Sequence, residues 1–123
     1  MEHPWRVCIQ SWCFRDIRDN AAVAGGIHSC GISAVEISGA HVDVRDPGSF
    51  SGVVSAYRDR GIAIPSIGVC HLSGDAEKDR PHFEFARTAS AGAISITFSF
   101  RSYPDVLRVS ERLADEYGVR LAI

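Results

Sequence analysis

Two side chains in this sequence carry groups that often bind a ligand or move a proton, and each lies near the end of a β-rich run. Glu36 lies on the polar face of residues 34–38, and His71 follows the run 62–69. The Glu36 carboxylate could bind ligand hydroxyl groups or orient a base. It could equally be structural, and it then needs hydrogen-bond partners because burying an unpaired charge is costly. His71 could contact a ligand or be a solvated loop residue. Because no second metal-ligating residue lies at a suitable spacing, the sequence gives little support for a metal site at His71.

Trp12 and Arg101 complete the set of candidate ligand-binding residues. The Trp12 ring could cover the apolar face of a ligand, or it could pack in the core. Arg101 could hold a phosphate, although an arginine in such a loop is more often solvated. Functional groups of (β/α) folds gather at the carboxyl ends of the strands. The sequence therefore predicts a ligand site built from Trp12, Glu36, His71 and Arg101.

Composition and charge exclude several classes of protein. The 123 residues are 46% hydrophobic and 23% charged, with a formal net charge of -2, which is typical of a single globular domain spanning 1–123. A net charge this close to zero gives no indication of the basic surface that nucleic-acid binding needs. No apolar run approaches the roughly 20 residues that a membrane span needs, and the N-terminus lacks a signal-peptide pattern, so we expect a cytoplasmic protein. The sequence contains no Walker loop and no serine nucleophile motif.

The four cysteines do not form a recognisable metal or redox motif. They are Cys8, Cys13, Cys30 and Cys70, and no two of them form a C-x-x-C pair. Without a secretion signal, a disulfide framework is not expected. We expect buried free thiols that act as small apolar residues.

A repeated unit organises the chain: an amphipathic stretch, a glycine and a short β-rich run. The glycines are Gly31, Gly61, Gly92 and Gly118, about 26 to 31 residues apart, a period typical of stacked supersecondary units. A glycine just past a helix can adopt the left-handed conformation that closes the last turn. With residues 6–14 as an opening strand, the order is β-α repeated four times and then β. This order predicts a parallel sheet with right-handed crossovers.

The helices that this repeat requires differ in quality. Residues 104–117 begin with a proline followed by an acid and place four large apolar side chains on one face. The first helix contains Gly25 and Gly26, and each costs about 1 kcal/mol relative to alanine unless close packing offsets the loss.

The faces of the β-rich runs favour a barrel over an open, doubly wound sheet. Strands covered by helices on both faces read as continuous aliphatic runs, whereas barrel strands alternate between the helix layer and the interior. One face here is large and apolar: Val7, Ile9, Val35, Ile37, Ile94, Ile96, Phe98, Phe100, Val119, Leu121 and Ile123. The other is small or polar: Cys8, Gln10, Trp12, Ala34, Glu36, Ser38, Ser95, Thr97, Ser99, Arg120 and Ala122. Only the third strand, interrupted by Pro65 and Gly68, departs from this alternation.

In these segments the sequence resembles the xylose isomerase-like TIM barrels, the sugar phosphate isomerases and epimerases. The resemblance rests on residues 8–14 (CIQSWCF), 30–37 (CGISAVEI), 64–68 (IPSIG) and 118–123 (GVRLAI), in this order and spacing. The family barrel has eight strands. The resemblance therefore implies an α/β fold in which this chain is the N-terminal half-barrel, with four β-α units and a fifth strand.

The resemblance also implies a chemistry. The family typically holds a divalent metal (Mn, Mg, Co or Zn) on carboxylate and histidine ligands at the ends of the fifth to eighth strands, and it isomerises or epimerises a sugar or sugar phosphate by proton transfer. No residue of this chain can be assigned to that metal set, so we expect no isomerase activity from the chain alone. Catalytic residues stay unassigned, and the expected substrate-binding residues are Trp12, Glu36, His71 and Arg101.

Two other hypotheses remain open. A non-catalytic half-barrel could self-associate or pair with a partner chain that covers the strand edges at residues 6–14 and 119–123, because exposed apolar edges promote association. An abasic-site endonuclease-like DNA repair protein would share the fold and could bind zinc through a histidine near His71. The chain lacks the basic surface and the second matching histidine that this DNA-binding role needs.

Overall fold

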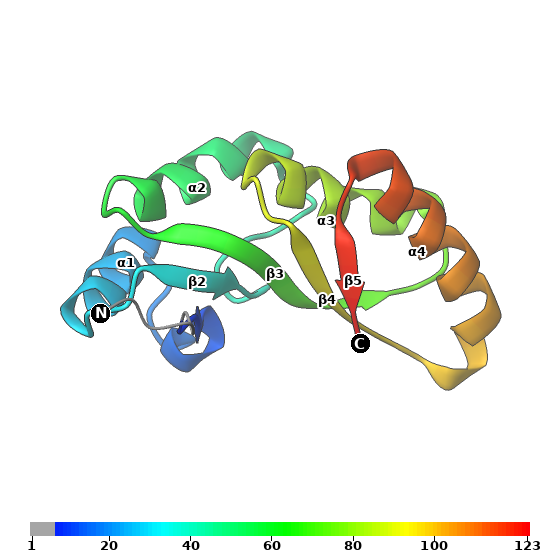
Figure 1. The fold of residues 1–123 in the computed structure, drawn as a ribbon, viewed down its shortest axis with the longest axis horizontal. Coiled ribbons are helices and arrows are strands. Elements are labelled where there is room, and N and C mark those ends of the chain that lie inside the picture. Colours follow the sequence, from blue (N-terminus) through cyan, green and yellow to red (C-terminus); the bar gives the residue numbers. More distant parts are fainter. Residues whose placement is uncertain (1–6) are drawn as a thin grey trace, which may run out of the picture.

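The protein is described by a computed structural model that places residues 7–123 as five strands and four helices in alternation (Figure 1). The strands are β1 (Ile9–Gln10), β2 (Ala34–Ile37), β3 (Ala63–Leu72), β4 (Ala93–Phe98) and β5 (Arg120–Ala122). The helices are α1 (Asn20–Ser29), α2 (Phe50–Arg58), α3 (Ala76–Thr88) and α4 (Tyr103–Tyr117). Short 3-10 helices, η1 (Ser11–Phe14), η2 (Pro47–Ser49) and η3 (Phe100–Ser102), precede α1, α2 and α4. Among residues 7–123, no helix has the length and apolar character needed to cross a membrane.

The strands form one parallel sheet in which they follow each other in chain order, β1-β2-β3-β4-β5. Figure 1 shows α2, α3 and α4 arranged along one face of this sheet. The other face is open within the described part of the chain, and Val69, His71, Thr97 and Arg120 are exposed there. A sequential parallel sheet with helices on one side is a partial (β/α) barrel and not a doubly wound sheet, which confirms the predicted fold class.

The helix-covered face holds the hydrophobic core that the alternating pattern predicted. Strand residues of the predicted apolar face are almost fully buried: Val35, Ile37, Ile94 and Ile96. Large side chains from all four helices meet them: Val23, Ile27, Phe50, Val54, Tyr57, Phe83, Phe85, Val106 and Leu113. The prediction of this apolar face is wrong at three residues, because Val7, Phe100 and Ile123 are 69%, 90% and 89% exposed. Phe100 leaves the sheet because β4 ends two residues earlier and the chain turns into η3.

All four helices end in the same hydrogen-bonded turn. The chain passes through a left-handed residue, and the next N–H donates to the carbonyl five residues earlier. These bonds are Ile32 N to Ile27 O (3.4 Å), Ile62 N to Tyr57 O (3.0 Å), Ala91 N to Ala86 O (2.8 Å) and Val119 N to Ala114 O (3.1 Å). The left-handed residue is Gly31, Gly61 and Gly118 in three turns, as predicted, but Ser90 (φ 54°) after α3. The prediction for Gly92 is wrong because Gly92 lies past the turn, directly before β4, where its N–H donates to the Pro65 carbonyl of β3 (3.0 Å).

Strand β3 is irregular where Pro65 and Gly68 interrupt its sequence pattern. Its register shifts by one residue against β2 and again against β4, so it carries two bulges. At Gly68 φ is 140°, and a Cβ would lie 2.5 Å from the Ser95 carbonyl oxygen, so glycine is required there. The bulges place Ser66 and His71 on the open face, with buried residues between and after them.

The first strand is much shorter than predicted. β1 comprises Ile9–Gln10, and the chain then turns into η1, whereas the sequence predicted a strand over residues 6–14, of which residue 6 lies outside the described part. Gln10 caps the turn, because its side-chain oxygen accepts the Trp12 N–H (2.8 Å). In α1, a Cβ on Gly26 would lie 3.0 Å from the Phe14 ring. The glycine that weakens the helix thus lets η1 pack closely against it.

The expectation of buried thiols is wrong for three of the four cysteines. Cys8, Cys13 and Cys30 are exposed, and Cys70 is buried. Cys13 is carried outward by η1, which replaces the end of the predicted strand, and Cys30 lies in the turn after α1.

Candidate functional site

A polar network crosses the open face of the sheet and is centred on Glu36 of β2. Glu36 Oε1 accepts a hydrogen bond from Gln10 Nε2 of β1 (3.1 Å), and Oε2 accepts from Ser66 Oγ of β3 (2.7 Å) and Ser95 Oγ of β4 (2.9 Å). Gln10 Nε2 also donates to the Gly68 carbonyl oxygen (2.7 Å). One carboxylate thus joins four strands through side-chain hydrogen bonds.

This network gives Glu36 the partners that a structural carboxylate needs. A carboxylate offers about four acceptor positions, so one position on Oε1 remains for a ligand or another side chain. Burial, with the Glu36 charge as the second cause, raises the pKa of Cys70 to about 12, and partial desolvation together with the same charge raises the pKa of Cys8, which is otherwise exposed. Both thiols near the network are therefore protonated at neutral pH. A direct contact between Glu36 and a substrate stays a prediction.

A cleft of about 470 Å³ lies at the carboxyl ends of the first strands. It is lined by Gln10, Trp12, Cys13, Ser38, Gly39, Ala40 and Val69. Trp12 is 54% exposed and the Arg15 guanidinium lies 5.3 Å from its ring centroid, so the ring stands at the cleft and not in the core. Ser11 fixes this wall to the end of β2, since its hydroxyl donates to Ser38 Oγ (2.9 Å) and accepts the Ser38 N–H (2.8 Å).

His71 lies beside this cleft and inside β3, not in the loop after it as predicted, because the strand extends one residue beyond His71. Its side chain is exposed and lines a second cleft of about 280 Å³, together with His82 of α3. Burial lowers the pKa of His82, an effect that the Asp79 charge partly opposes. Gly39 and Val69 line both clefts. The structure therefore places His71 and Trp12 in adjoining hollows at the same edge of the sheet.

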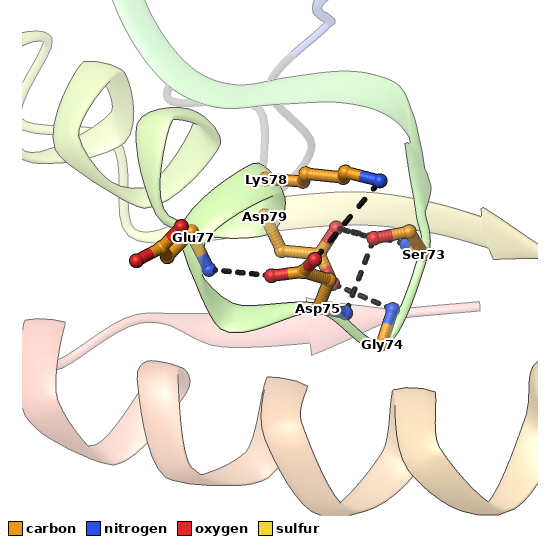
Figure 2. Close-up of polar contacts among 6 residues, drawn as sticks. All are labelled: Ser73, Gly74, Asp75, Glu77, Lys78 and Asp79. Atoms are coloured by element: carbon orange, nitrogen blue, oxygen red, sulfur yellow. Dashed lines mark hydrogen bonds and ion pairs between the residues drawn. The ribbon is translucent and has the colours of Figure 1, made fainter.

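The loop that follows His71 is held by a buried carboxylate that sequence analysis missed. Asp79, in the first turns of α3, accepts hydrogen bonds from Ser73 N–H (2.8 Å), Ser73 Oγ (2.9 Å) and Gly74 N–H (2.8 Å) and is 2% exposed (Figure 2). Asp75 caps the helix beside it. Acids near a helix start are an ordinary capping signal, and such a signal does not show which acid turns inward.

Arg101 lies apart from the other candidates. It is exposed in η3 and lines neither cleft. Its neighbour Phe100 stacks on Tyr103, with ring centroids 6.5 Å apart and an interplanar angle of 19°. The four predicted residues therefore divide into three places. Gln10 links Trp12 to Glu36, His71 occupies the adjoining cleft, and Arg101 stands at the β4–α4 turn.

The network residues beside Glu36 were not singled out from the sequence. Gln10 and Ser95 stood on the predicted polar face, at the same alternation as Glu36, and that shared face was the available signal. Ser66 gave no such signal, because the first bulge of β3 changes which residues face the interior.

The described residues do not fit the divalent metal that the family resemblance implies. Among residues 7–123, no three His, Cys, Asp or Glu side chains lie close enough together to hold a metal ion. Catalytic zinc sites use three protein ligands, and sites for Mg²⁺ need at least one or two carboxylates free to bind it. Glu36, the carboxylate at the centre of the open face, is held by amide and hydroxyl donors. No step through a metal follows from this chain's own residues.

The fold is similar to two solved structures over most of this chain. One is an uncharacterized protein from Parabacteroides distasonis ATCC 8503, with a TM-score of 0.72 and 19% identity. The other is described as the probable 3-DHS dehydratase AsbF involved in petrobactin synthesis from Bacillus anthracis, with a TM-score of 0.65 and 13% identity. Each match covers 97% of this chain and 52% of the other, so the chain spans about half the length of these proteins. At these identities the similarity shows the fold alone, and no protein-family model or curated protein sequence matches the chain.

Proposed function

We propose that this chain forms the N-terminal half of a (β/α)-barrel enzyme that isomerises or epimerises a sugar or sugar phosphate. The observation that carries the proposal is the cleft at Trp12 and Gln10, which lies at the carboxyl ends of the strands beside the Glu36 network. Active sites of (β/α) barrels lie at this end. The similarity to a protein described as a dehydratase supports an enzyme of this fold. The sugar chemistry rests on the sequence resemblance to the xylose isomerase-like barrels.

Each cleft residue has a role that its environment allows. The exposed Trp12 ring would pack on the C–H face of a sugar, and Glu36 would accept a hydrogen bond from a sugar hydroxyl that displaces the Gln10 amide from Oε1. His71, in the adjoining cleft, would exchange a hydrogen bond with a second hydroxyl. Arg101 would meet only a substrate long enough to reach the β4–α4 turn, as a terminal phosphate would.

The complete enzyme needs residues beyond this chain. The matched structures are about twice as long, and no metal-ligand group occurs within residues 7–123. We therefore assign the divalent metal, whether Mn, Mg, Co or Zn, to ligands in the remaining half of the barrel. The 123-residue chain alone is expected to show no turnover.

The test is a substrate screen on the full-length protein with a divalent metal and a panel of aldoses, ketoses and their phosphates. Once a substrate is found, Trp12→Ala should raise KM at least about tenfold, equivalent to about 1.4 kcal/mol. The melting temperature should stay unchanged, because the ring is exposed. Phe100→Ala is the matched control, an exposed aromatic outside both clefts. Absence of turnover across the panel, or equal effects of the two substitutions on KM, would contradict the proposal.

A second candidate is a non-catalytic half-barrel that pairs with itself or with a partner chain. It is favoured by the outer edges of the sheet, where Val7 is 69% and Ile123 is 89% exposed. Sedimentation of the 123-residue chain separates the two functions. A discrete dimer together with an inactive full-length protein would favour pairing, whereas turnover by the full-length protein would favour the enzyme.

A further inference from the structure

The positively charged side chain of Arg120 lies on the same face and in the same row of the sheet as Glu36. The strand registers place five residues opposite one another in turn: Gln10, Glu36, Ser66, Ala93 and Arg120. Successive strand residues point to opposite faces. Ser95 bonds to Glu36, so Ala93, two residues before it, shares that open face. Leu121 packs against the helix-covered core, so its neighbour Arg120 lies on the open face as well.

Neither of these charges has a partner of opposite sign within residues 7–123. None of the four ion pairs in this part of the chain includes Glu36 or Arg120. The three hydrogen-bond donors to Glu36 are neutral, and one acceptor position on Oε1 is free. Arg120 is exposed at the outermost strand. In the open sheet, water can solvate both groups.

Closure of the sheet would remove that water. The two matched structures are about twice as long as this chain, and a completed barrel would enclose the open face. A carboxylate without a counter-ion is strongly unfavourable in such an interior. For the same reason, removing one partner of a buried ion pair is strongly destabilising. The positions near Glu36 on this face are small or neutral, such as Ala34 and Ala93, and supply no charge of their own.

The distance between the two residues suits a contact across the interior. Three strand steps of about 4.8 Å separate them, which is about 14 Å along the sheet, and the curvature of a barrel shortens the direct path. An extended arginine and an extended glutamate joined by a hydrogen bond span a distance of this order. Histidine would be too short to make the same contact from this strand.

We propose that Arg120 is the counter-ion of Glu36 in the closed barrel, with its guanidinium donating to the free position on Glu36 Oε1. Arg120 is thus a positioning residue. By holding Glu36 it holds Gln10, and the Gln10 side-chain oxygen in turn caps the η1 turn that carries Trp12. The inference requires a closed barrel but not the sugar chemistry, so a failed substrate screen would leave it standing.

The test is a double-mutant cycle on the full-length protein, followed by thermal unfolding. Glu36→Gln and Arg120→Met should each lower the melting temperature by about 5 °C or more, since each leaves one buried charge unpaired. The double variant should unfold close to the more damaged single variant, because the two substitutions remove the same interaction. Glu36→Gln combined with Arg101→Met is the control, and these effects should add, since Arg101 lies in η3 and off the sheet.

Additive effects of Glu36→Gln and Arg120→Met, or an Arg120→Met protein as stable as the wild type, would overturn the proposal. If the Glu36→Gln protein does not accumulate, the Arg120 variants alone test the proposal. Arg120→Lys keeps the charge with a shorter reach and should recover part of the stability that Arg120→Met loses. Equal losses in the methionine and lysine variants would also overturn the proposal.

Discussion

Two carboxylates in this protein each accept three hydrogen bonds, but their donors come from very different parts of the chain. The donors to Asp79 lie five or six residues away in one loop, and its side chain is 2% exposed. The donors to Glu36 lie 26, 30 and 59 residues away on three other strands. The Asp79 contacts form with the loop itself, whereas the Glu36 network forms only when four strands are in register.

This difference separates the two halves of the candidate site. The Asp79 contacts fix the β3–α3 loop beside His71 and need nothing from the rest of the barrel. The cleft at Trp12 depends on Gln10 and hence on the Glu36 network, which lies on the face that stays open. We therefore expect substitutions around Asp79 to act through local stability and substitutions around Glu36 to act through the assembly of the sheet.

The largest effect is expected at Asp79. Asp79→Ala leaves two partly buried backbone N–H groups and the Ser73 hydroxyl without their charged acceptor and should lower the unfolding free energy by about 3 kcal/mol. Urea unfolding measures this loss. Asp75→Ala, which removes a more exposed cap of the same helix, should cost about 1 kcal/mol and serves as the control. Equal costs for the two variants would show that the buried carboxylate does not anchor the loop.

The Glu36 network should respond less to the loss of a single donor. Ser66→Ala and Ser95→Ala each remove one hydroxyl donor to the carboxylate oxygen Oε2 and should cost about 1.5 kcal/mol each. Because both hydroxyls serve the same oxygen, the double variant should depart from additivity. Ser51→Ala, on the exposed surface of α2, is the matched control. A loss as large as that of Asp79→Ala would remove the contrast between the two carboxylates.

A local effect of opposite sign is expected at the end of α3. Ser90 adopts φ 54°, a conformation that costs a non-glycine residue about 1 kcal/mol or more. Ser90→Gly should therefore raise the unfolding free energy by about 1 kcal/mol. Gly61→Ser, at the equivalent turn after α2 with no atom within 4 Å of the added Cβ, should lower it by a similar amount. A change of the same sign in both variants would contradict this backbone explanation.

The smallest effect is a pH dependence at His82. Burial holds its pKa below the ordinary value of 6.5, so the unfolded chain binds a proton more readily than the folded protein. Stability should therefore fall as the pH drops through about 6.5, by less than about 1 kcal/mol because the side chain is only partly buried. Melting temperatures of the wild type and His82→Gln, compared above and below this pH, measure the contribution of His82 to stability.

His28→Gln, at an exposed position in α1, is the control for that series. Adding Asp79→Asn should enlarge the pH dependence, because the Asp79 charge opposes the lowering of the His82 pKa. If wild type and His82→Gln lose the same stability on acidification, His82 does not contribute to it.

Most of the fold could be predicted from the sequence because the signals are local and periodic. The glycine repeat set the element order, and the alternation of Val35, Ile37, Ile94 and Ile96 with polar residues identified the buried face. The same alternation placed Glu36 on the open face. Prediction failed where a contact outside the periodic pattern decided the structure. The Gln10 cap shortened the first strand, and Ser90, not Gly92, took the left-handed turn after α3.

The candidate site could be predicted only in part, for the same reason. Trp12 and Glu36 were singled out because the sequence placed them at a strand end and on a strand face. Ser66 was missed because a bulge shifts the register of β3 in a way that Pro65 alone does not specify. Asp79 was missed because capping acids look alike in sequence, and the direction in which one points depends on the loop it meets.

The four helix-ending turns have a consequence for how this architecture can change. Each passes the chain from a helix to the next strand over a few residues with one hydrogen-bonding scheme, whereas the strand-to-helix segments range from the short β3–α3 loop to the long stretch between β2 and α2. Insertions and deletions are therefore tolerated mainly at the edge that carries the clefts, and the opposite edge preserves strand register. New specificities can arise by exchange of whole loops, with the sheet as a constant frame.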